Sequence, residues 1–428
     1  MTLVEILLIL ILGLMAIAVP IGFAVIAGVV GVLLWVGDIN LMVVPQSIFG
    51  GIDGFTLLAI PFFLLAGSLM TAGGMTRRLL ELADAMLGHK PGGLAMSGVV
   101  ASTLFAGISG SAVADTSALG RIMIPAMVKV GHRPAFAASL IAAANVVAPV
   151  IPPSIPFIVM GVLTNQSITN LFLAGVIPGL LYTVAMLWIA RRLAIRDAPA
   201  VRTGKRPPGT VRRALARAAF ALLMPVFILV GIRMGVFNIT ECSGVAVVYA
   251  LFVGGVVHRE LDLKRIYAAL VSAGRSTAVI MIVVGAAKLF SWLLAYTGVP
   301  QAVSAFVLAN VSDALVFLLV VNVLLLIIGM FLEANAALVM LVPVLYPIAL
   351  ALGVDPVHFG VVVVLNLCIG LITPPVGLCL NIACMIARSP LERGSVAILP
   401  FLAAALAVLL LVTLVPQASL LLPGLAAG

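Results

Sequence analysis

The sequence predicts an all-α, polytopic membrane protein made of two inverted repeats, each with a re-entrant helical hairpin and a broken helix. Three observations lead to this fold class: an apolar composition, a basic segment that splits the apolar sequence in two, and a set of motifs that occurs once on each side of the split. The composition indicates the class of protein, and the motifs indicate how its helices are arranged.

The composition excludes a water-soluble fold. Of the 428 residues, 64% are hydrophobic and 9% are charged, whereas charged residues make up about 25% of a typical soluble domain. A soluble enzyme, a nucleic-acid-binding protein and a disordered protein are therefore excluded. The net charge of +9 is interpreted as the basic excess that orients membrane spans. Because a span needs about 20 apolar residues, the chain can contain at most about a dozen membrane spans.

The apolar runs predict the helices in order. Several runs are too short to cross a bilayer, and Gly (40 residues) and Pro (25 residues) are frequent. Broken helices are therefore expected instead of a simple bundle, because a broken segment needs a neighbour or a cavity to satisfy its backbone. The runs cover about 3–19, 21–36, 55–71, 93–108, 134–150, 155–163, 171–190, 218–237, 243–257, 277–297, 301–310, 314–332, 356–372, 376–387 and 396–421.

A basic segment divides the chain. Between Arg191 and Arg217 lie nine of the 23 Lys and Arg residues and a single acid, Asp197, together with several Pro and Gly. This composition predicts a cytoplasmic linker over 191–217 between membrane halves at 1–190 and 218–428. A site for acidic lipid or nucleic acid is the alternative, and the topological interpretation is preferred.

A set of motifs occurs once in each half, in the same order. Each copy has an acid, a proline ten residues later, a Gly-x-x-Pro, an Asn and a Pro-Pro. The distance from Gly-x-x-Pro to Pro-Pro is 21 residues in both copies (152 − 131 and 374 − 353). Such a pattern predicts an internal duplication in which Asp115 corresponds to Glu333. The copies comprise Asp115, Pro125, Gly131–Pro134, Asn145 and Pro152–Pro153, and Glu333, Pro343, Gly353–Pro356, Asn366 and Pro374–Pro375.

Repeated halves with broken apolar helices are typical of secondary transporters, whose sites lie near the bilayer midplane where the repeats meet. A Pro-Pro in an apolar run removes two amide donors and frees carbonyl groups that lipid cannot satisfy. Freed carbonyls, with hydroxyl and amide oxygens, suit a hard cation such as sodium. Opened helix ends offer amide groups to a carboxylate. The pattern therefore predicts sodium-coupled transport of an organic anion.

The candidate residues lie at the hairpin tips and at the breaks. The run 107–117 suits the tip of a re-entrant hairpin, with a helix-packing seam as the alternative, and 329–335 is its second copy. Asp115 and Glu333 are placed beside an ion or at a hairpin base, and the alternatives are that they bind protons in a proton-coupled transporter or make structural hydrogen bonds. The residues expected to bind or gate substrate are Asp115, Thr116, Pro152, Pro153, Ser154, Pro374, Pro375 and Lys288.

Two of the candidate side chains have competing interpretations. Lys288 lies in otherwise apolar sequence, where it would attract a substrate carboxylate, snorkel to the surface or form a structural ion pair. Asn145 would offer a carbonyl oxygen to an ion or cap a broken helix. No P-loop motif is present in the sequence, so nucleotide hydrolysis by this chain is not expected.

These residues resemble the large membrane subunit of the TRAP (tripartite ATP-independent periplasmic) transporters, the DctM-like family. The resemblance covers nearly the whole chain. It implies an elevator-type ion-transporter fold in the bacterial inner membrane, driven by sodium. It also implies a small DctQ-like membrane subunit of about four spans and a DctP-like periplasmic binding protein that delivers a carboxylate-bearing solute. The matching segments are 18–24, 60–67, 107–116, 152–154 and 371–377.

The resemblance further implies two sodium sites and no other cofactor or metal. The first site would lie at the first hairpin tip and the first break, and the second site at the corresponding places of the second repeat. Many of their ligands would be main-chain oxygens. Their residues are Ser109, Gly110, Ser111, Asn145, Ala148 and Pro149, and Gly329, Glu333, Asn335, Gly370 and Thr373.

Two other functions compete with this one. A stand-alone sodium–anion symporter would have similar hairpins but would not need a small subunit or a binding protein. An intramembrane enzyme would need Asp115 and Glu333 to act as an aspartyl pair, yet neither lies in a protease motif. Buried acids alone are weak evidence for catalysis, so the chain is not expected to be an enzyme.

Overall fold

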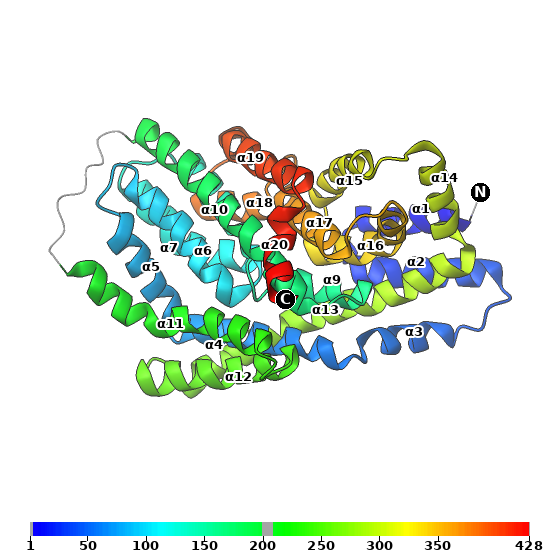
Figure 1. The fold of residues 1–428 in the computed structure, drawn as a ribbon, viewed down its shortest axis with the longest axis horizontal. Helices are drawn as coiled ribbons and strands as arrows, with labels where there is room; N and C mark the ends of the chain where they lie inside the picture. Colours follow the sequence, from blue (N-terminus) through cyan, green and yellow to red (C-terminus); the bar gives the residue numbers. More distant parts are fainter. Residues whose placement is uncertain (1–2, 199–208, 428) are drawn as a thin grey trace.

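The computed structural model describes residues 3–198 and 209–427, and the described residues form helices and no strands (Figure 1). The predicted all-α polytopic fold is confirmed. Seven helical segments within the described ranges are long and apolar enough to cross a membrane, and shorter apolar helices lie between them. The seven are Phe55–Ala72, Ile168–Asp197, Thr210–Arg233, Ile239–Val257, Leu263–Thr297, Ala334–Ala351 and Leu391–Leu414.

The helices follow the chain in two sets. The first set is α1 (Leu3–Ala16), α2 (Ile21–Val36), α3 (Val43–Ile52), η1 (Phe55–Leu58), α4 (Ala59–Ala72), α5 (Met75–Leu87), α6 (Gly93–Ser109), α7 (Ala112–Lys129), α8 (Pro134–Asn145), α9 (Ile155–Thr164) and α10 (Ile168–Asp197). The second set is α11 (Thr210–Arg233), α12 (Ile239–Phe252), η2 (Val253–Val257), α13 (Leu263–Thr297), α14 (Val299–Asn310), α15 (Ala314–Gly329), α16 (Ala334–Ala351), α17 (Pro356–Gly370), α18 (Leu378–Ala387), α19 (Leu391–Leu414) and α20 (Gln417–Ala427).

Each half contains the predicted hairpin and the predicted broken helix. Helices α6 and α7 meet at Gly110, and α15 and α16 meet over residues 330–333. The apolar run 134–150 is not one helix, because α8 ends at Asn145 and α9 begins only at Ile155. In the second half α17 ends at Gly370 and α18 begins at Leu378. Both gaps contain the Pro-Pro pair. Pro374 lacks the amide that would bond to the last residue of α17, and Pro149 lacks the corresponding amide after α8.

The structure corrects the register of the repeat. Helices α7 and α16 are both 18 residues long, and their N-cap residues are Ser111 and Glu333. These caps are 222 residues apart (333 − 111), and the same separation joins Gly107 to Gly329, Pro125 to Pro347 and Pro152 to Pro374. The predicted pairing of Asp115 with Glu333 is therefore wrong, since Asp115 corresponds to Ala337. The acid-to-proline spacing of ten was coincidental, because α16 contains both Pro343 and Pro347.

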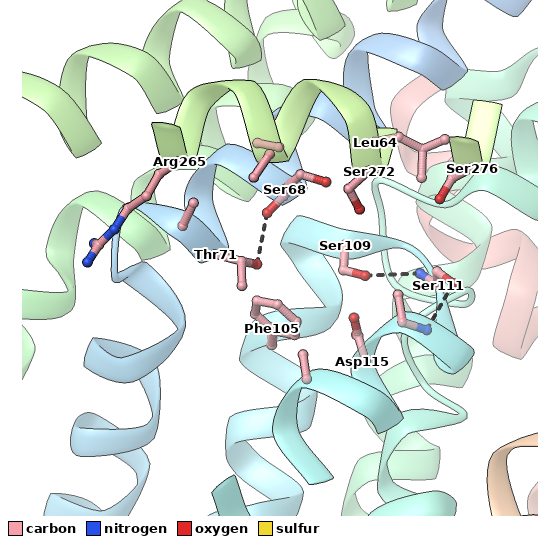
Figure 2. A pocket seen from close by; sticks show the side chains of 16 residues that line it. Leu64, Ser68, Thr71, Phe105, Ser109, Ser111, Asp115, Arg265, Ser272 and Ser276 are labelled. Atoms are coloured by element: carbon pink, nitrogen blue, oxygen red, sulfur yellow. Dashed lines mark hydrogen bonds between the residues drawn. The ribbon is translucent and has the colours of Figure 1, made fainter. Parts of the chain in front are cut away.

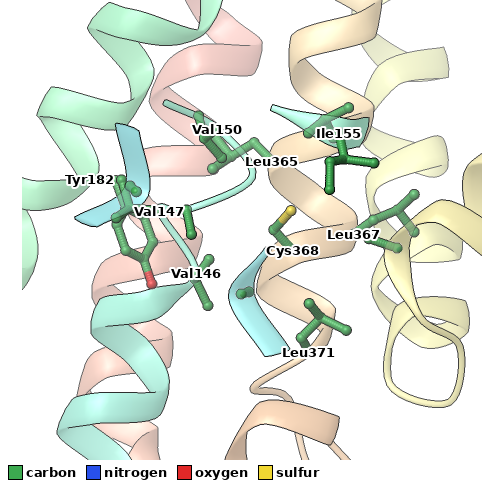
Figure 3. Packing of buried hydrophobic residues seen from close by; sticks show 14 of the residues in the cluster. Val146, Val147, Val150, Ile155, Tyr182, Leu365, Leu367, Cys368 and Leu371 are labelled. Carbon is green, nitrogen blue, oxygen red and sulfur yellow. The ribbon is translucent and has the colours of Figure 1, made fainter. Parts of the chain in front are cut away.

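The two repeats exchange helices across a shared core. Helix α7 contacts α8 of its own repeat and α18 of the other, while α16 contacts α17 of its own repeat and α9 of the other. This reciprocal exchange is what a pseudo-twofold relation between the repeats produces. Figure 3 shows Val147 and Val150 of the first break beside Leu365 and Cys368 of α17, and all four are fully buried. Each broken helix is therefore held by both halves.

Part of the predicted linker is helical. Helix α10 continues to Asp197 and α11 begins at Thr210, so both ends of the segment 191–217 extend the flanking helices. Residues 199–208, which include most of the Pro and Gly of the segment, lie outside the described residues. The structure leaves the predicted cytoplasmic location of the linker as a prediction.

The remaining helices form a frame beside the repeats. The 35-residue α13 contacts α2, α3, α4 and α16, and a second, smaller core joins it to α1 and α2. The turn that leads into α13 is fixed to α5, because Glu260 accepts hydrogen bonds from Arg77 and Arg78 at 2.9 and 2.8 Å. Burial alone would raise the pKa of Glu260, but the hydrogen bond and charge of Arg78 and the charge of Arg77 hold that pKa below its ordinary value of 4.5.

Replacing Glu260 by Gln should destabilise the frame, because Arg78 would lose its carboxylate partner. We expect a loss of about 1 kcal/mol in unfolding free energy, measured by thermal unfolding in detergent. Since the pKa of Glu260 is lowered on folding, its contribution is present above pH 4.5 and disappears as the pH falls through the lowered value. The control is Glu81→Gln, since Glu81 makes only a 3.8 Å pair with Arg77 and is about half exposed. An equal loss in both variants would contradict this role.

Candidate functional site

The first hairpin tip is a two-residue connection packed onto the first break. Gly110 has a positive φ of 64° and caps α6, and a Cβ atom at this position would lie 2.5 Å from the carbonyl oxygen of Pro153. The Ser111 amide donates to Ser109 Oγ, and Ser111 Oγ accepts from the Ala114 amide, both at 3.4 Å. Glycine is therefore required for the close approach, and the two hydroxyls hold the tip.

The first break leaves one buried amide oxygen without a donor. Asn145 Nδ2 donates to the Ile141 carbonyl at 3.0 Å, whereas Asn145 Oδ1 has no hydrogen-bond partner among the described residues. Ser154 caps α9 by accepting from the Phe157 amide at 3.2 Å, and its hydroxyl donates to the Pro149 carbonyl. Ala148 is fully buried beside it. The break thus directs Asn145 Oδ1 and main-chain oxygens into a region from which water is excluded.

The second hairpin tip uses a carboxylate where the first uses a hydroxyl. Glu333 accepts from the Asn335 and Ala336 amides at 3.0 and 3.3 Å and from Asn335 Nδ2 at 2.8 Å. It is therefore the N-cap of α16, as the structural alternative predicted. Asn335 Oδ1 is buried and has no partner in the described part of the chain. A second orphaned amide oxygen thus lies beside the second tip.

The second break is held against its hairpin by two glycines. A Cβ atom on Gly370 would lie 2.6 Å from the Cα atom of Gly329. The Gly377 amide donates to the Met330 carbonyl at 3.2 Å, which joins the break to the hairpin. Thr373 Oγ1 donates back to the Ile369 carbonyl at 2.9 Å, so its hydroxyl is used within the helix end. Asn366 Nδ2 donates to the main-chain carbonyl and the side-chain oxygen of Asn322 on α15 at 2.9 and 2.7 Å, whereas Asn366 Oδ1 is buried and has no partner among the described residues.

The two tips meet at a small cavity between the repeats. Its volume is about 10 Å³, close to the smallest space that holds one water molecule. Gly110, Ser111 and Pro149 line it from the first repeat, and Glu333 and Asn335 line it from the second. Residues that are far apart in the sequence, and that were predicted to form two separate ion sites, are therefore neighbours.

A larger cavity of about 590 Å³ opens on the other side of the first tip (Figure 2). Its walls come from the hairpin α6–α7 and from the frame helices α4 and α13. Asp115 lines it beside Ser109, yet neither carboxylate oxygen of Asp115 reaches hydrogen-bonding geometry with a described residue. A buried, unpartnered carboxylate in a membrane protein indicates a place where a cation or a polar group binds.

The sequence interpretation missed the wall of this cavity formed by α13. Arg265 lies at one end, where its guanidinium donates to the Glu260 carbonyl at 2.7 Å. Ser272 and Ser276 follow on the same face of α13, and Ser68 and Thr71 face them from α4 (Figure 2). The sequence feature that could have revealed this wall is the recurrence of small and polar residues every three or four positions along α13, which places them on one face of the helix.

Several predicted substrate residues have other positions. Lys288 is exposed and packs against Gly51 of α3. It lines neither cavity, and the cationic residue that lines the larger cavity is Arg265. Thr116 is buried and donates to the Ala112 carbonyl at 2.7 Å within α7. The others shape the breaks without lining either cavity: Pro152, Pro153, Ser154, Pro374 and Pro375. Asp115 alone of this predicted set lines the larger cavity.

The fold and the site define a class of protein: a polytopic membrane transporter in which two hairpin-and-break repeats meet at a buried polar centre. This polar centre consists of the two hairpin tips, the two breaks and the small cavity between them. Comparison with known families places the chain within that class. Residues 8–418 match the family model of the DctM component of the tripartite ATP-independent periplasmic transporters. The chain belongs to this family, and the resemblance identified from the sequence is confirmed.

Relatives from other bacteria support this assignment. The large permease protein SiaM of the sialic acid TRAP transporter of Vibrio cholerae is 39% identical, over 97% of each chain. The C4-dicarboxylate permease DctM of Pseudomonas aeruginosa is 40% identical, over 93% of this chain and 92% of the relative. The isethionate permease DctMQ of Oleidesulfovibrio alaskensis is 41% identical over 95% of this chain, which spans 64% of that protein. These relatives are named as permeases and not as enzymes, so the enzyme alternative is set aside.

The fold is also shared with a more distant transporter. The crystal structure of the YdaH transporter of Alcanivorax borkumensis, described as having an unusual topology, aligns with a TM-score of 0.65 over 89% of each chain. The sequence identity is 17%, so this likeness concerns the fold alone.

Substituting Gly370 by Ala should disrupt the second site, because the added methyl group would collide with the backbone of Gly329. We expect the hairpin to separate from the break, with a loss of about 1–3 kcal/mol in unfolding free energy, measured by thermal unfolding in detergent. Gly274→Ala is the matched control: this helical glycine has open space around it, and alanine should be neutral or stabilising there. If the Gly370 variant were as stable as the Gly274 variant, the contact between Gly370 and Gly329 would have room for a methyl group.

Proposed function

We propose that this chain is the translocating subunit of a TRAP transporter that couples sodium entry to the uptake of a carboxylate-bearing organic solute. It would act in the bacterial inner membrane with a small DctQ-like membrane subunit and a DctP-like periplasmic binding protein that delivers the solute. The family assignment supports the division into subunits, and the polar centre between the repeats supports the coupling to an ion.

The observation that carries the sodium proposal is the presence of buried amide oxygens without donors close to both breaks. Asn145 Oδ1 lies at the first break, Asn366 Oδ1 lies in the last turns of α17 before the second break, and Asn335 Oδ1 lies at the second tip. Of these three residues, Asn335 lines the small cavity. An orphaned buried acceptor costs about 1–3 kcal/mol, and a hard cation relieves this cost by accepting oxygen ligands. No group of His, Cys, Asp and Glu among the described residues suits a multidentate metal. Neutral oxygens are instead the ligands that monovalent cations use in membrane proteins.

The larger cavity supports the solute part of the proposal. Its volume of about 590 Å³ lies within the range of small-molecule sites. The Arg265 guanidinium donates to the Glu260 carbonyl and lies 4.0 Å from the Asp262 carboxylate, and its remaining N–H groups would have to turn toward the cavity to bind a carboxylate. The serines of α4 and α13 offer hydroxyls to the rest of the solute. Two relatives are named for sialic acid and for C4-dicarboxylates, which are acids. Asp115 would repel such a group, so we place it toward a cation or a hydroxyl of the solute.

The position of this cavity supports an elevator movement. One wall belongs to the first hairpin and the other to the frame helices α4 and α13. A solute held there would contact both the first hairpin and the frame helices, and a displacement of the repeats relative to the frame would carry the solute across the membrane. The breaks and tips would move as one unit, because each hairpin contacts both broken helices.

Ser111→Ala should weaken the sodium dependence of uptake. The change removes a hydroxyl oxygen from the small cavity, and we expect a several-fold rise in the sodium concentration for half-maximal uptake, as for one neutral ligand. The measurement is solute uptake by proteoliposomes containing both membrane subunits, with the binding protein outside. Ser395→Ala on α19 is the control, since Ser395 lines neither cavity. Unchanged sodium dependence in the Ser111 variant would make its hydroxyl purely structural.

Arg265→Gln should weaken solute transport without altering the sodium dependence. Loss of a charged hydrogen bond to a carboxylate predicts a tenfold to hundredfold fall in apparent affinity, as an order of magnitude. The assay is uptake from a panel of carboxylates at saturating sodium. Arg275→Gln is the matched control, because Arg275 is exposed on the same helix and lies outside the cavity. A normal solute affinity in the Arg265 variant would place the carboxylate elsewhere.

A further inference from the structure

A third cavity, of about 900 Å³, lies apart from the polar centre, where four helix ends converge. Helix α8 begins there, α10 and α18 end there, and α19 begins there. Figure 1 shows α10, α18 and α19 side by side at this end of the molecule. The proposed transport function uses none of its residues.

Arginine side chains dominate the lining of this cavity. Four arginines face two acids, Asp197 and Glu392. Asp197 is already neutralised, because its carboxylate accepts from the Arg133 amide at 2.9 Å and pairs with the Arg133 guanidinium and with His132. The other three arginines have no ion pair with any described residue. They are Arg196, Arg388 and Arg393.

Two helix N-termini, of α8 and α19, and two helix C-termini, of α10 and α18, meet at the cavity, so the positive field comes mainly from the arginines. Neither α8 nor α19 has a side-chain hydrogen bond at its N-cap, which is Arg133 in α8 and Pro390 in α19. The first-turn amides of both helices therefore lack capping side chains, and both helix dipoles present their positive ends at the cavity. The Asp197 carboxylate accepts from the N-cap amide of α8, and Glu392 lies in the first turn of α19. Guanidinium groups beside the first-turn amides of a helix, here those of α19, are usual elements of a phosphate site.

The cavity borders an apolar surface. Val396 lines the cavity and is 70% exposed, and Leu399, one turn further along α19, is 53% exposed. On α10, Arg192 lies 4.3 Å from the ring centre of the exposed Trp188. Tryptophan paired with basic residues at a span end marks the level of the lipid headgroups. The arginines of the cavity can thus bind a headgroup, and the exposed apolar side chains at its edge can contact acyl chains.

We propose that this cavity binds the headgroup of an anionic phospholipid. The phosphodiester would contact Arg388 and Arg393 and the first-turn amides of α19, and the acyl chains would lie along Val396 and Leu399. Basic pockets between span ends are known to select such lipids. The site is independent of the sodium and solute sites, so its test requires no transport.

The test is lipid binding to the purified, delipidated chain in detergent, counted by native mass spectrometry. Phosphatidylglycerol is the probe, phosphatidylcholine is the zwitterionic comparison, and millimolar inorganic phosphate is the soluble competitor. The variant is Arg388→Gln with Arg393→Gln. Its matched control is Arg212→Gln with Arg213→Gln, which removes the same charge from exposed positions on α11.

We expect the wild-type chain to retain phosphatidylglycerol in preference to phosphatidylcholine, and phosphate not to displace it. The Arg388/Arg393 variant should bind roughly thirty-fold more weakly, and the control should bind as the wild type does. Equal loss in the control, no loss in the variant, or full displacement by phosphate would overturn the proposal. If the double variant is not monodisperse, the single variant Arg393→Gln is tested in its place, and its affinity for phosphatidylglycerol is expected to fall about fivefold.

Discussion

The structure depends on how backbone groups are satisfied where two helices are broken inside an apolar core. Pro149 and Pro374 each lie four residues after the last residue of α8 and α17 and lack the amide that would bond to it, and lipid offers no partner for the carbonyl groups that are released. Each break is therefore covered by a hairpin tip, and the close contacts of Gly110 with Pro153 and of Gly370 with Gly329 leave no room for side chains. The crossing of α7 and α16 between the repeats encloses both breaks in one core.

The corrected register shows that the repeats have diverged at one key position. The tips are capped by Ser111 in the first repeat and by Glu333 in the second. Asp115 has no acidic counterpart, because the equivalent residue is Ala337, and Asp115 is the acid that faces the larger cavity. The symmetric elements thus build the small central cavity, whereas the asymmetric acid and the frame residue Arg265 provide the polar groups of the larger one. This asymmetry suits a transporter whose ions and solute bind side by side.

Much of this arrangement could be predicted from the sequence. The apolar composition predicted the fold class, and the repeated Pro-Pro and Gly-x-x-Pro motifs predicted both breaks, because proline acts on its own backbone. The register of the acids was predicted wrongly because the acid-to-proline spacing was matched to Pro343, whereas the constant separation of 222 residues between the Gly-x-x-Pro motifs and between the Pro-Pro motifs pairs Pro125 with Pro347. Arg265 and Lys288 were not distinguished, because the face of α13 that meets the hairpin depends on packing against α4. The arginine cavity was also missed, as its residues come from four helix ends.

The proposed sodium coupling uses one cation site at each break, and both sites must be filled for transport. The most direct measurement is the ratio of radioactive sodium to solute taken up by proteoliposomes that contain the complete transporter at a fixed membrane potential. We expect two sodium ions per solute, one for each break. A ratio of one would leave one break purely structural, and solute uptake without sodium uptake would overturn the proposed coupling.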